Sequence, residues 1–217
     1  MPRIALTKGR ILEPALAWLR ERGFRLPEVE ARSLLLPLGD GWEAVLLKGP
    51  DVPVFVQNGA ADLGIVGSDI LEEEAPDVYD LKALGFGRCR LSLAGPPGRD
   101  PRGEGPLRVA TKYPRTAERI FRESGEWVRI FRLRSSAELA PLLGLSDLIV
   151  DVVDTGRTLR ENGLVEKMTL RPVEAHLVAN RSSYRFLEDR WWEAAGRRGP
   201  EDGGSGPSCI RVPAGPS

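Results

Sequence analysis

The sequence has few of the residues from which many catalytic and structural sites are built. It contains one histidine, His176, and two cysteines, Cys89 and Cys209. These counts exclude a multi-histidine metal site and are too low for a disulfide framework or a cysteine-based zinc site. A Ser-His-Asp triad would have to use His176, but its neighbours are typical of a strand and no nucleophile motif supports such a triad. We therefore expect His176 to be structural.

Net charge and long apolar runs are also missing. Lys+Arg and Asp+Glu are both 31, so the chain has no overall field to attract nucleic acid. No apolar run approaches the roughly 20 residues of a membrane span. The first residues, Met1 to Leu6, lack the apolar core of an export signal. We expect a cytoplasmic protein that binds neither nucleic acid nor membrane.

The stretch around which the chain is organised runs from Asp147 to Leu164. Its apolar, β-branched start predicts a buried strand that carries Asp151. The polar residues Asp154 to Thr158 then predict a short loop that turns into a helix. Thr158 is expected to cap this helix, and Gly163 is expected to end it.

The chemistry of this loop predicts a sugar-phosphate site. Consecutive N–H groups at the start of a helix bind anions, and two threonine hydroxyls and Arg157 add donors. Asp151 and Asp154 would be out of place in a pure phosphate site. They can, however, accept hydrogen bonds from the hydroxyl groups of a sugar.

Other strand-to-helix junctions also carry charged residues. Lys8-Gly9-Arg10 follows a predicted strand at 3–7, and Gly9 would let the backbone approach a ligand; an anion site and two solvated cations explain these residues equally well. Asp69 follows a strand at 61–66 and either caps the next helix or meets a ligand. Lys112 follows a strand at 107–110. Ligands in open α/β sheets bind at such carboxyl ends of strands.

Two further cations, Arg32 and Lys48, lie near the ends of predicted strands at 32–38 and 42–48. On spacing alone, isolated cations of this kind are more often surface residues than site residues. Other local patterns predict helices at 51–59, capped by Asp51, and at 136–143, capped by Ser136. A helix is expected at 183–195, and strand-like segments at 164–178 are expected to break at Pro172.

The alternation of strands and helices predicts an α/β protein. The block 88–173 looks self-contained, and the chain near 176–185 returns to the first block. A chain that leaves a domain and comes back forms two lobes with a cleft between them. We expect one discontinuous lobe at 1–87 plus 174–196, a second lobe at 88–173 that holds the phosphate loop, and a flexible tail at 197–217.

Five motifs, in the same order, resemble the ATP phosphoribosyltransferase family, which performs the first step of histidine biosynthesis. Besides the loop at 147–164, they are Ala5 to Arg10, Asp51 to Pro53 with Gly59 and Asp62 to Leu71, Phe86 to Leu91, and Val109 to Pro114. The resemblance runs from about Ile4 to Asn180. The sequence departs from the family where Thr7, Ser135 and Ala137 replace the more usual Pro, Gly and branched aliphatic residue.

The resemblance implies a two-lobed fold similar to the type II periplasmic binding proteins. It implies condensation of ATP with 5-phosphoribosyl 1-pyrophosphate, with Mg²⁺ as cofactor, to give N1-(5-phosphoribosyl)-ATP and pyrophosphate. The short tail implies the short form of the family. Short forms work with a regulatory subunit that resembles histidyl-tRNA synthetase, and a homo-oligomer, most simply a dimer, is expected.

The resemblance also implies roles for individual residues. Asp151 would accept hydrogen bonds from the ribose hydroxyls, directly or through Mg²⁺ carried by the substrate phosphates. Arg32 and Lys48 would be further catalytic residues. Together with Lys8 and Arg10, they would surround pyrophosphate and the ATP phosphates. The expected substrate-binding residues are Lys8, Gly9, Arg10, Asp69, Lys112, Asp154, Thr155, Gly156, Arg157 and Thr158.

Two other classes share part of this pattern. A nucleobase-salvage phosphoribosyltransferase would share the loop but would not explain the other four motifs. A non-catalytic solute-binding protein would share the fold but should carry an export signal.

Overall fold

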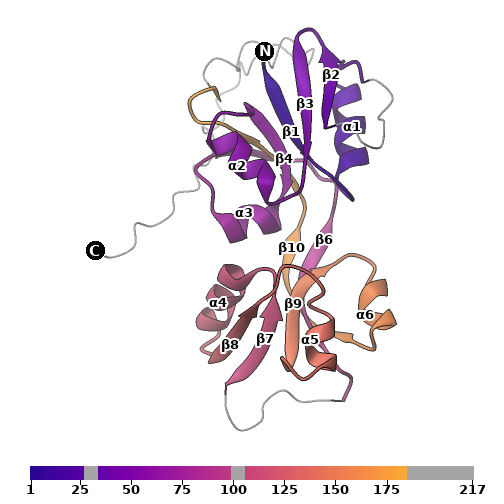
Figure 1. The fold of residues 1–217 in the computed structure, drawn as a ribbon, viewed down its shortest axis with the longest axis vertical. Coiled ribbons are helices and arrows are strands. Elements are labelled where there is room, and N and C mark those ends of the chain that lie inside the picture. Colours follow the sequence, from indigo (N-terminus) through magenta and orange to yellow (C-terminus); the bar gives the residue numbers. More distant parts are fainter. Residues whose placement is uncertain (27–33, 99–105, 185–217) are drawn as a thin grey trace, which may run out of the picture. The chain divides into compact units, whose positions relative to one another are not determined.

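The computed structural model describes residues 1–26, 34–98 and 106–184, and it confirms the α/β prediction. The chain divides into two compact units, each with its own sheet (Figure 1). Unit 1 comprises Met1–Gly87 and the chain from Glu174 onward, and unit 2 comprises Arg88–Val173. Unit 2 is therefore a continuous segment inserted between two parts of unit 1. Within the described residues, no helix is long and apolar enough to cross a membrane.

Unit 1 is built on a six-stranded sheet in the order β2-β3-β1-β4-β11-β5. The strands are β1 (Arg3–Thr7), β2 (Leu35–Gly39), β3 (Trp42–Leu47), β4 (Leu63–Gly67), β5 (Tyr79–Ala83) and β11 (Ala175–Ala179). The neighbours β3, β1 and β4 run parallel, whereas β2, β11 and β5 each run antiparallel to the strands they pair with. The helices are α1 (Leu12–Arg20), α2 (Asp51–Gln57) and α3 (Ser68–Glu74).

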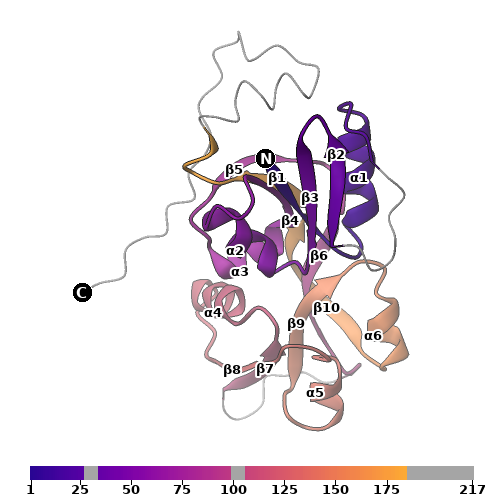
Figure 2. The ribbon, with the colours of Figure 1, turned by 45° about the horizontal axis from the view of Figure 1, so that its top comes forward.

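The alternation of side chains along β1 explains why helices cover both faces of this sheet. Ile4 and Leu6 point to one face and join the core cluster that contains Leu16 of α1. Ala5 points to the other face and packs in a second cluster with Val52 of α2. Successive side chains of a strand point to opposite faces, so one strand serves both cores. Figure 2 shows α1 on one side of the sheet, with α2 and α3 on the other.

Unit 2 is built on a five-stranded sheet in the order β10-β6-β9-β7-β8. The strands are β6 (Cys89–Gly95), β7 (Leu107–Thr111), β8 (Val128–Arg132), β9 (Leu148–Val153) and β10 (Val165–Val173), and the helices are α4 (Pro114–Glu123), α5 (Leu139–Leu142) and α6 (Arg157–Glu161). β9 and β8 run parallel to β7, whereas β6 and β10 are antiparallel to their neighbours. Ala140 of α5 and Leu159 of α6 share a core cluster with Ile149 of β9.

Three predicted helix caps are wrong. Thr158 lies inside α6, because the helix begins two residues earlier than predicted, directly after Gly156. Ser136 has a φ of 51°, and α5 begins only at Leu139. Asp51 is the first residue of α2 rather than its cap. The end of α6 follows the prediction, since Gly163 adopts a positive φ immediately after the last turn.

Two strand predictions also need correction. Pro172 does not break the chain into two strands; it lies within β10, opposite Arg90. β10 is an edge strand, where a residue without an N–H group is tolerated. β5 was not predicted from the sequence, and its side chains are all half-buried or exposed. The predicted helix at 183–195 lies almost entirely outside the described residues, and so does the tail at 197–217.

Candidate functional site

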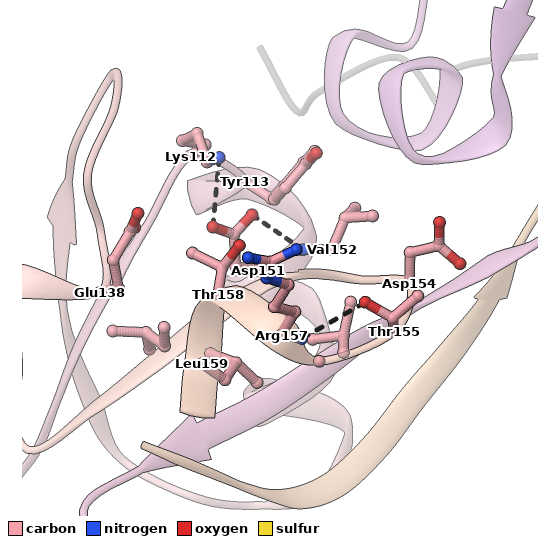
Figure 3. Close-up of a pocket in the computed structure, with 13 residues that line it drawn as sticks. Lys112, Tyr113, Glu138, Asp151, Val152, Asp154, Thr155, Arg157, Thr158 and Leu159 are labelled. Atoms are coloured by element: carbon pink, nitrogen blue, oxygen red, sulfur yellow. Dashed lines mark hydrogen bonds and ion pairs between the residues drawn. The ribbon is translucent and has the colours of Figure 1, made fainter. Parts of the chain in front are cut away.

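Unit 2 contains a pocket of about 380 Å³ at the end of β9 (Figure 3). The residues from Ile149 to Leu159, without Val150, supply most of its wall, and they include the whole predicted phosphate loop, 154–158. Lys112 and Tyr113, which follow β7, and Glu138, which precedes α5, complete it. The pocket therefore gathers Asp151, the loop and Lys112, which lie in separate motifs of the sequence.

The parallel pairing of β7 with β9 brings Lys112 to Asp151. Thr111 lies opposite Val150 in this pairing, so the residues that follow each of them are neighbours. The Thr111 hydroxyl donates to the Val150 carbonyl at 2.6 Å and accepts from the Tyr113 N–H at 2.9 Å. These two bonds tie the turn after β7 to β9.

Asp151 is a largely buried carboxylate with one ion-pair partner. Its side chain is 15% exposed, against 37% for Lys112, and Lys112 Nζ lies 3.1 Å from its Oδ2. Its Oδ1 accepts the Val152 N–H at 2.8 Å (Figure 3). Burial raises the pKa of Asp151, Lys112 opposes that rise, and nearby Glu138 adds to it. The carboxylate is thus held in place as an acceptor without being neutralised by several cations.

The loop reverses direction at Gly156, which has a φ of 70°. A Cβ added at this position would lie 3.3 Å from Arg160 Nη1, in addition to the backbone strain of a left-handed conformation. Arg160 Nη1 donates to the Thr155 carbonyl at 3.0 Å. The Arg157 N–H lies 3.4 Å from the Thr155 hydroxyl, a long hydrogen bond. Glycine is therefore the residue that this turn requires.

Arg157, a predicted donor, lines the pocket but is largely exposed. Its side chain is 78% exposed, and its Nε contacts Glu161 one turn later at 2.7 Å. An exposed pair of this spacing is weak, so a phosphate could replace Glu161 at little cost.

The guanidinium of Arg90, which does not line the pocket, contacts the first residue of the loop. Arg90 on β6 donates from Nη1 to the Asp154 carbonyl at 3.0 Å, and its Nε and Nη2 contact the two oxygens of Glu166 at 2.7 and 2.5 Å. Ser92 and Thr169 also donate to Glu166. The hydrogen bond from Arg90 is the main reason that the pKa of Glu166 is lowered to about 2.

Two of the predicted cations of unit 1, Lys8 and Lys48, follow neighbouring strands of its sheet. Thr7 lies opposite Leu47 in the parallel β1–β3 pair, so Lys8 and Lys48 follow neighbouring strands at the same edge. The Lys8 N–H donates to the Leu47 carbonyl at 2.7 Å. Arg32 lies outside the described residues.

The neighbouring residues at this edge make backbone contacts. Gly9 has a φ of 92°, and open space surrounds the position where a Cβ would stand. Arg10 donates to the Gly87 carbonyl. Asp69 lies in the first turn of α3, whose cap residue is Gly67, so Asp69 is not the helix cap. Its carboxylate lies over Gly67, where a Cβ would approach Asp69 Oδ1 to 2.1 Å.

His176 lies in β11, between β4 and β5 of the unit 1 sheet. Its Nδ1 is 2.9 Å from the carboxylate of Asp80 on the neighbouring strand β5, and this hydrogen bond raises the pKa of His176. The contact agrees with the structural role predicted from the sequence.

Arg90, Arg160 and Glu138 were not among the site residues predicted from the sequence. Arg90 lies in the motif Phe86 to Leu91, but nothing in the motif indicates that its partner is a backbone carbonyl. Among residues 1–26, 34–98 and 106–184, no three His, Cys, Asp or Glu side chains are grouped as ligands of a metal ion. Three carboxylates, Glu138, Asp151 and Asp154, line the pocket. Mg²⁺ is typically held by one or two carboxylates together with substrate phosphates.

Comparison with known proteins identifies close relatives over most of the chain. The model of the HisG family, described as ATP phosphoribosyltransferase, matches residues 48–194. An ATP phosphoribosyltransferase of Bacillus velezensis is 46% identical over 197 residues, which cover 89% of this chain and 92% of the relative.

Solved structures also align with most of the chain. A chain of the ATP phosphoribosyl transferase (HisG:HisZ) complex from Thermotoga maritima aligns with a TM-score of 0.76 at 34% identity, covering 90% of this chain and 97% of that one. A histidine kinase sensor domain with similarity to periplasmic binding proteins aligns with a TM-score of 0.57 at 12% identity, over 90% and 89% of the two chains. The second likeness concerns the fold alone, and it confirms the predicted fold class.

Proposed function

The chain belongs to the ATP phosphoribosyltransferase family, whose members carry out the first step of histidine biosynthesis, and we propose that the pocket at the end of β9 is its site for phosphoribosyl pyrophosphate. The enzyme condenses ATP with this substrate to give N1-(5-phosphoribosyl)-ATP and pyrophosphate. The observation that carries the proposal is the shared pocket of Asp151 and loop 154–158, because a carboxylate beside an anion-binding loop suits a phosphorylated sugar.

In this pocket the loop binds the 5-phosphate. The backbone N–H groups and the hydroxyls of Thr155 and Thr158 donate to it, and Arg157 exchanges Glu161 for the phosphate. Asp151 accepts hydrogen bonds from the ribose hydroxyls. The ion pair with Lys112 opposes the effect of burial on the pKa of Asp151 and so favours the ionised carboxylate.

The reaction breaks the bond between ribose C1 and pyrophosphate, and adenine N1 forms the new bond with its own lone pair. No histidine base is required. Positive charge grows on the sugar and negative charge on the leaving group, so positioning and electrostatic stabilisation supply most of the rate. Lys8, Arg10, Lys48 and Arg32 bind the phosphates of pyrophosphate and ATP in this proposal, with Gly9 and Asp69 beside them.

Mg²⁺ is the proposed cofactor. It would be held by substrate phosphates together with Asp151, and when bound it neutralises charge on the departing pyrophosphate. The residues fit this role, since Asp151 is one of only a few carboxylates that line the pocket.

A histidyl-tRNA-synthetase-like regulatory subunit is the proposed partner, by analogy with the solved HisG:HisZ complex. Histidine is then expected to inhibit the assembly but not this chain alone, and inhibition of the isolated chain would contradict the proposal. A homodimer of this chain is the proposed minimal assembly, in the cytoplasm.

Mixing the protein with ATP, phosphoribosyl pyrophosphate and Mg²⁺ tests the function. The adenine ring changes its near-ultraviolet absorbance only if N1 is substituted. A nucleobase-salvage enzyme would consume phosphoribosyl pyrophosphate with a free base instead, and a solute-binding protein would consume neither substrate. Equilibrium binding of phosphoribosyl pyrophosphate to the Asp151→Asn variant then tests the assignment of the pocket.

A further inference from the structure

Two arginines from different elements each hold one carbonyl of the phosphate loop. Arg90, on β6, donates to the Asp154 carbonyl, and Arg160, on α6, donates to the Thr155 carbonyl, both at 3.0 Å. These carbonyls belong to consecutive peptide groups. Neither arginine lines the pocket, so each approaches the loop from outside the pocket.

The geometry of the peptide group gives these contacts a consequence for the N–H groups. The described residues contain no cis peptide bonds. In a trans peptide the C=O and N–H bonds point in opposite directions. A guanidinium that holds the Asp154 carbonyl therefore turns the Thr155 N–H away from itself. In the same way, Arg160 fixes the direction of the Gly156 N–H.

We propose that Arg90 and Arg160 are positioning residues, which orient the N–H groups of Thr155 and Gly156 for the phosphate of the sugar substrate. This inference rests on the proposed function of the pocket. Neither side chain needs to touch the substrate. Each fixes a peptide group before binding, so that less ordering of the loop is required when the phosphate arrives.

Arg90 is itself held rigidly. Its Nε and Nη2 form a two-point contact with Glu166, which also accepts from Ser92 and Thr169, and this leaves Nη1 for the loop carbonyl. A planar guanidinium can make these contacts at once, whereas a lysine ammonium lacks the fork. Arg160 is exposed and lies within the loop's own helix, so it can be replaced without disturbing the core.

The chain provides a matched control in Arg108. This residue of β7 contacts the carboxylate of Asp147 through Nε and Nη2 and donates from Nη1 to the Gly144 carbonyl at 2.9 Å. It therefore repeats the Arg90 arrangement in the same unit and at similar exposure, but on a turn outside the pocket. Loss of Arg108 removes the same kinds of contact without touching the phosphate loop.

The experiment is calorimetric titration of the full chain with phosphoribosyl pyrophosphate and, separately, with ATP. The variants are Arg90→Met, Arg90→Lys, Arg160→Met and the control Arg108→Met, and the thermal unfolding of each is recorded. We expect Arg90→Met and Arg160→Met to bind phosphoribosyl pyrophosphate about tenfold more weakly, the scale of one lost hydrogen bond. ATP affinity should change much less, and Arg108→Met should bind as the wild type does.

Arg90→Lys separates orientation from simple attraction of charge. It keeps the positive charge but loses the fork, so we expect it to bind as weakly as Arg90→Met; recovery of wild-type affinity would overturn the orienting role of Arg90. In amide NMR, phosphoribosyl pyrophosphate should shift the Thr155 and Gly156 signals less in Arg90→Met and Arg160→Met than in the wild type.

The remaining outcomes are also decisive. A wild-type protein that fails to bind phosphoribosyl pyrophosphate would refute the proposed function itself. A wild type that binds, with Arg90→Met and Arg160→Met both equal to Arg108→Met, would refute the positioning role alone. Should Arg90→Met not fold, Arg160→Met decides the question.

Discussion

Lys112 and Asp151 form an ion pair in unit 2, with 3.1 Å between Lys112 Nζ and Asp151 Oδ2. Lys112 follows β7, Asp151 lies in β9, and these two strands are parallel neighbours. The lysine is the more exposed partner, and burial of the aspartate raises its pKa. Lys112 therefore favours the ionised form of the carboxylate proposed to meet the ribose.

Asp151→Asn should abolish most of the turnover while leaving the fold intact. The variant keeps the size of the side chain but loses its charge, and loss of one such contact costs on the order of a hundredfold or more in rate. The pKa of Asp151 in the folded protein lies above its ordinary value of 3.8. The folded protein therefore binds this proton more tightly than the unfolded chain does, and stability is lost as pH rises from 3.8 through the raised pKa. We therefore expect the free energy of unfolding near pH 7 to be unchanged or higher in the variant. Near-normal kcat/KM would remove Asp151 from the reaction.

Lys112→Met should move the acid limb of the pH–rate profile to higher pH. Without the lysine, burial acts unopposed and raises the pKa of Asp151 further, so a larger fraction of the carboxylate is protonated at a given pH. The measurement is kcat/KM for phosphoribosyl pyrophosphate across the acid range. Lys167→Met, which removes an exposed lysine of β10, is the control. If both variants keep the wild-type limb, titration of Asp151 does not limit the reaction.

Thr158→Val should weaken binding of phosphoribosyl pyrophosphate by several-fold to tenfold, since the substitution removes one hydroxyl donor and keeps the shape. Thr158→Ser restores the hydroxyl and should restore the affinity. Calorimetry on both variants checks this. Equal affinities for valine, serine and threonine would place the hydroxyl outside the phosphate site.

Lys48→Ala should slow the departure of pyrophosphate. The residue follows β3 at the sheet edge where Lys8 follows β1, so its removal lowers the positive charge available to the leaving group. Single-turnover experiments measure the chemical step directly. Lys82→Ala, at an exposed position of β5, is the control for loss of a cation from unit 1. Lys48 is only a surface charge if both variants react at the wild-type rate.

Glu166→Gln should lower stability near neutral pH, and the difference from wild type should shrink in acid. Arg90 and two hydroxyls hold the pKa of Glu166 at about 2, below its ordinary 4.5. A lowered pKa of a carboxyl contributes stability above its unfolded value, and this contribution is lost as pH falls from 4.5 toward 2. Urea unfolding of both proteins between about pH 3 and pH 7 measures the trend. A difference that stays constant with pH would mean that the ionised pair contributes little.

The sequence predicted the fold well wherever local pattern decides the structure. The strand at 3–7 contains the short apolar run Ile4 to Leu6, and Gly163 ends α6 as its conformational freedom predicts. Local spacing did not place Lys48 beside Lys8; only the family resemblance grouped them, and the parallel pairing of β1 with β3 puts them at the ends of neighbouring strands. The pocket residues 151 and 154–158 were found because they lie close together in the chain.

The errors have physical causes. Thr158 and Ser136 are good capping residues, but Gly156 already makes the turn before α6, and Ser136 adopts a positive φ well before α5 begins. Proline normally interrupts a strand, because it lacks an N–H group for the sheet. Pro172 is tolerated because β10 lies at the edge of its sheet. Arg90 and Arg160 were not predicted, because their partners on the loop are backbone carbonyls. Every residue carries such a carbonyl, so no residue type marks the partner.

The position of β11 has a consequence for how the chain folds as it is made. β11 is the last described strand to leave the ribosome, yet it lies between β4 and the edge strand β5 in the unit 1 sheet. Until residues 88–173 have been synthesised, β4 has an open edge and β5 has no strand beside it in the described sheet. Unit 2, whose strands are continuous in sequence, can fold first. Unit 1 must close a sheet around a long insertion, a non-local step that slows folding and leaves an edge open to wrong pairing.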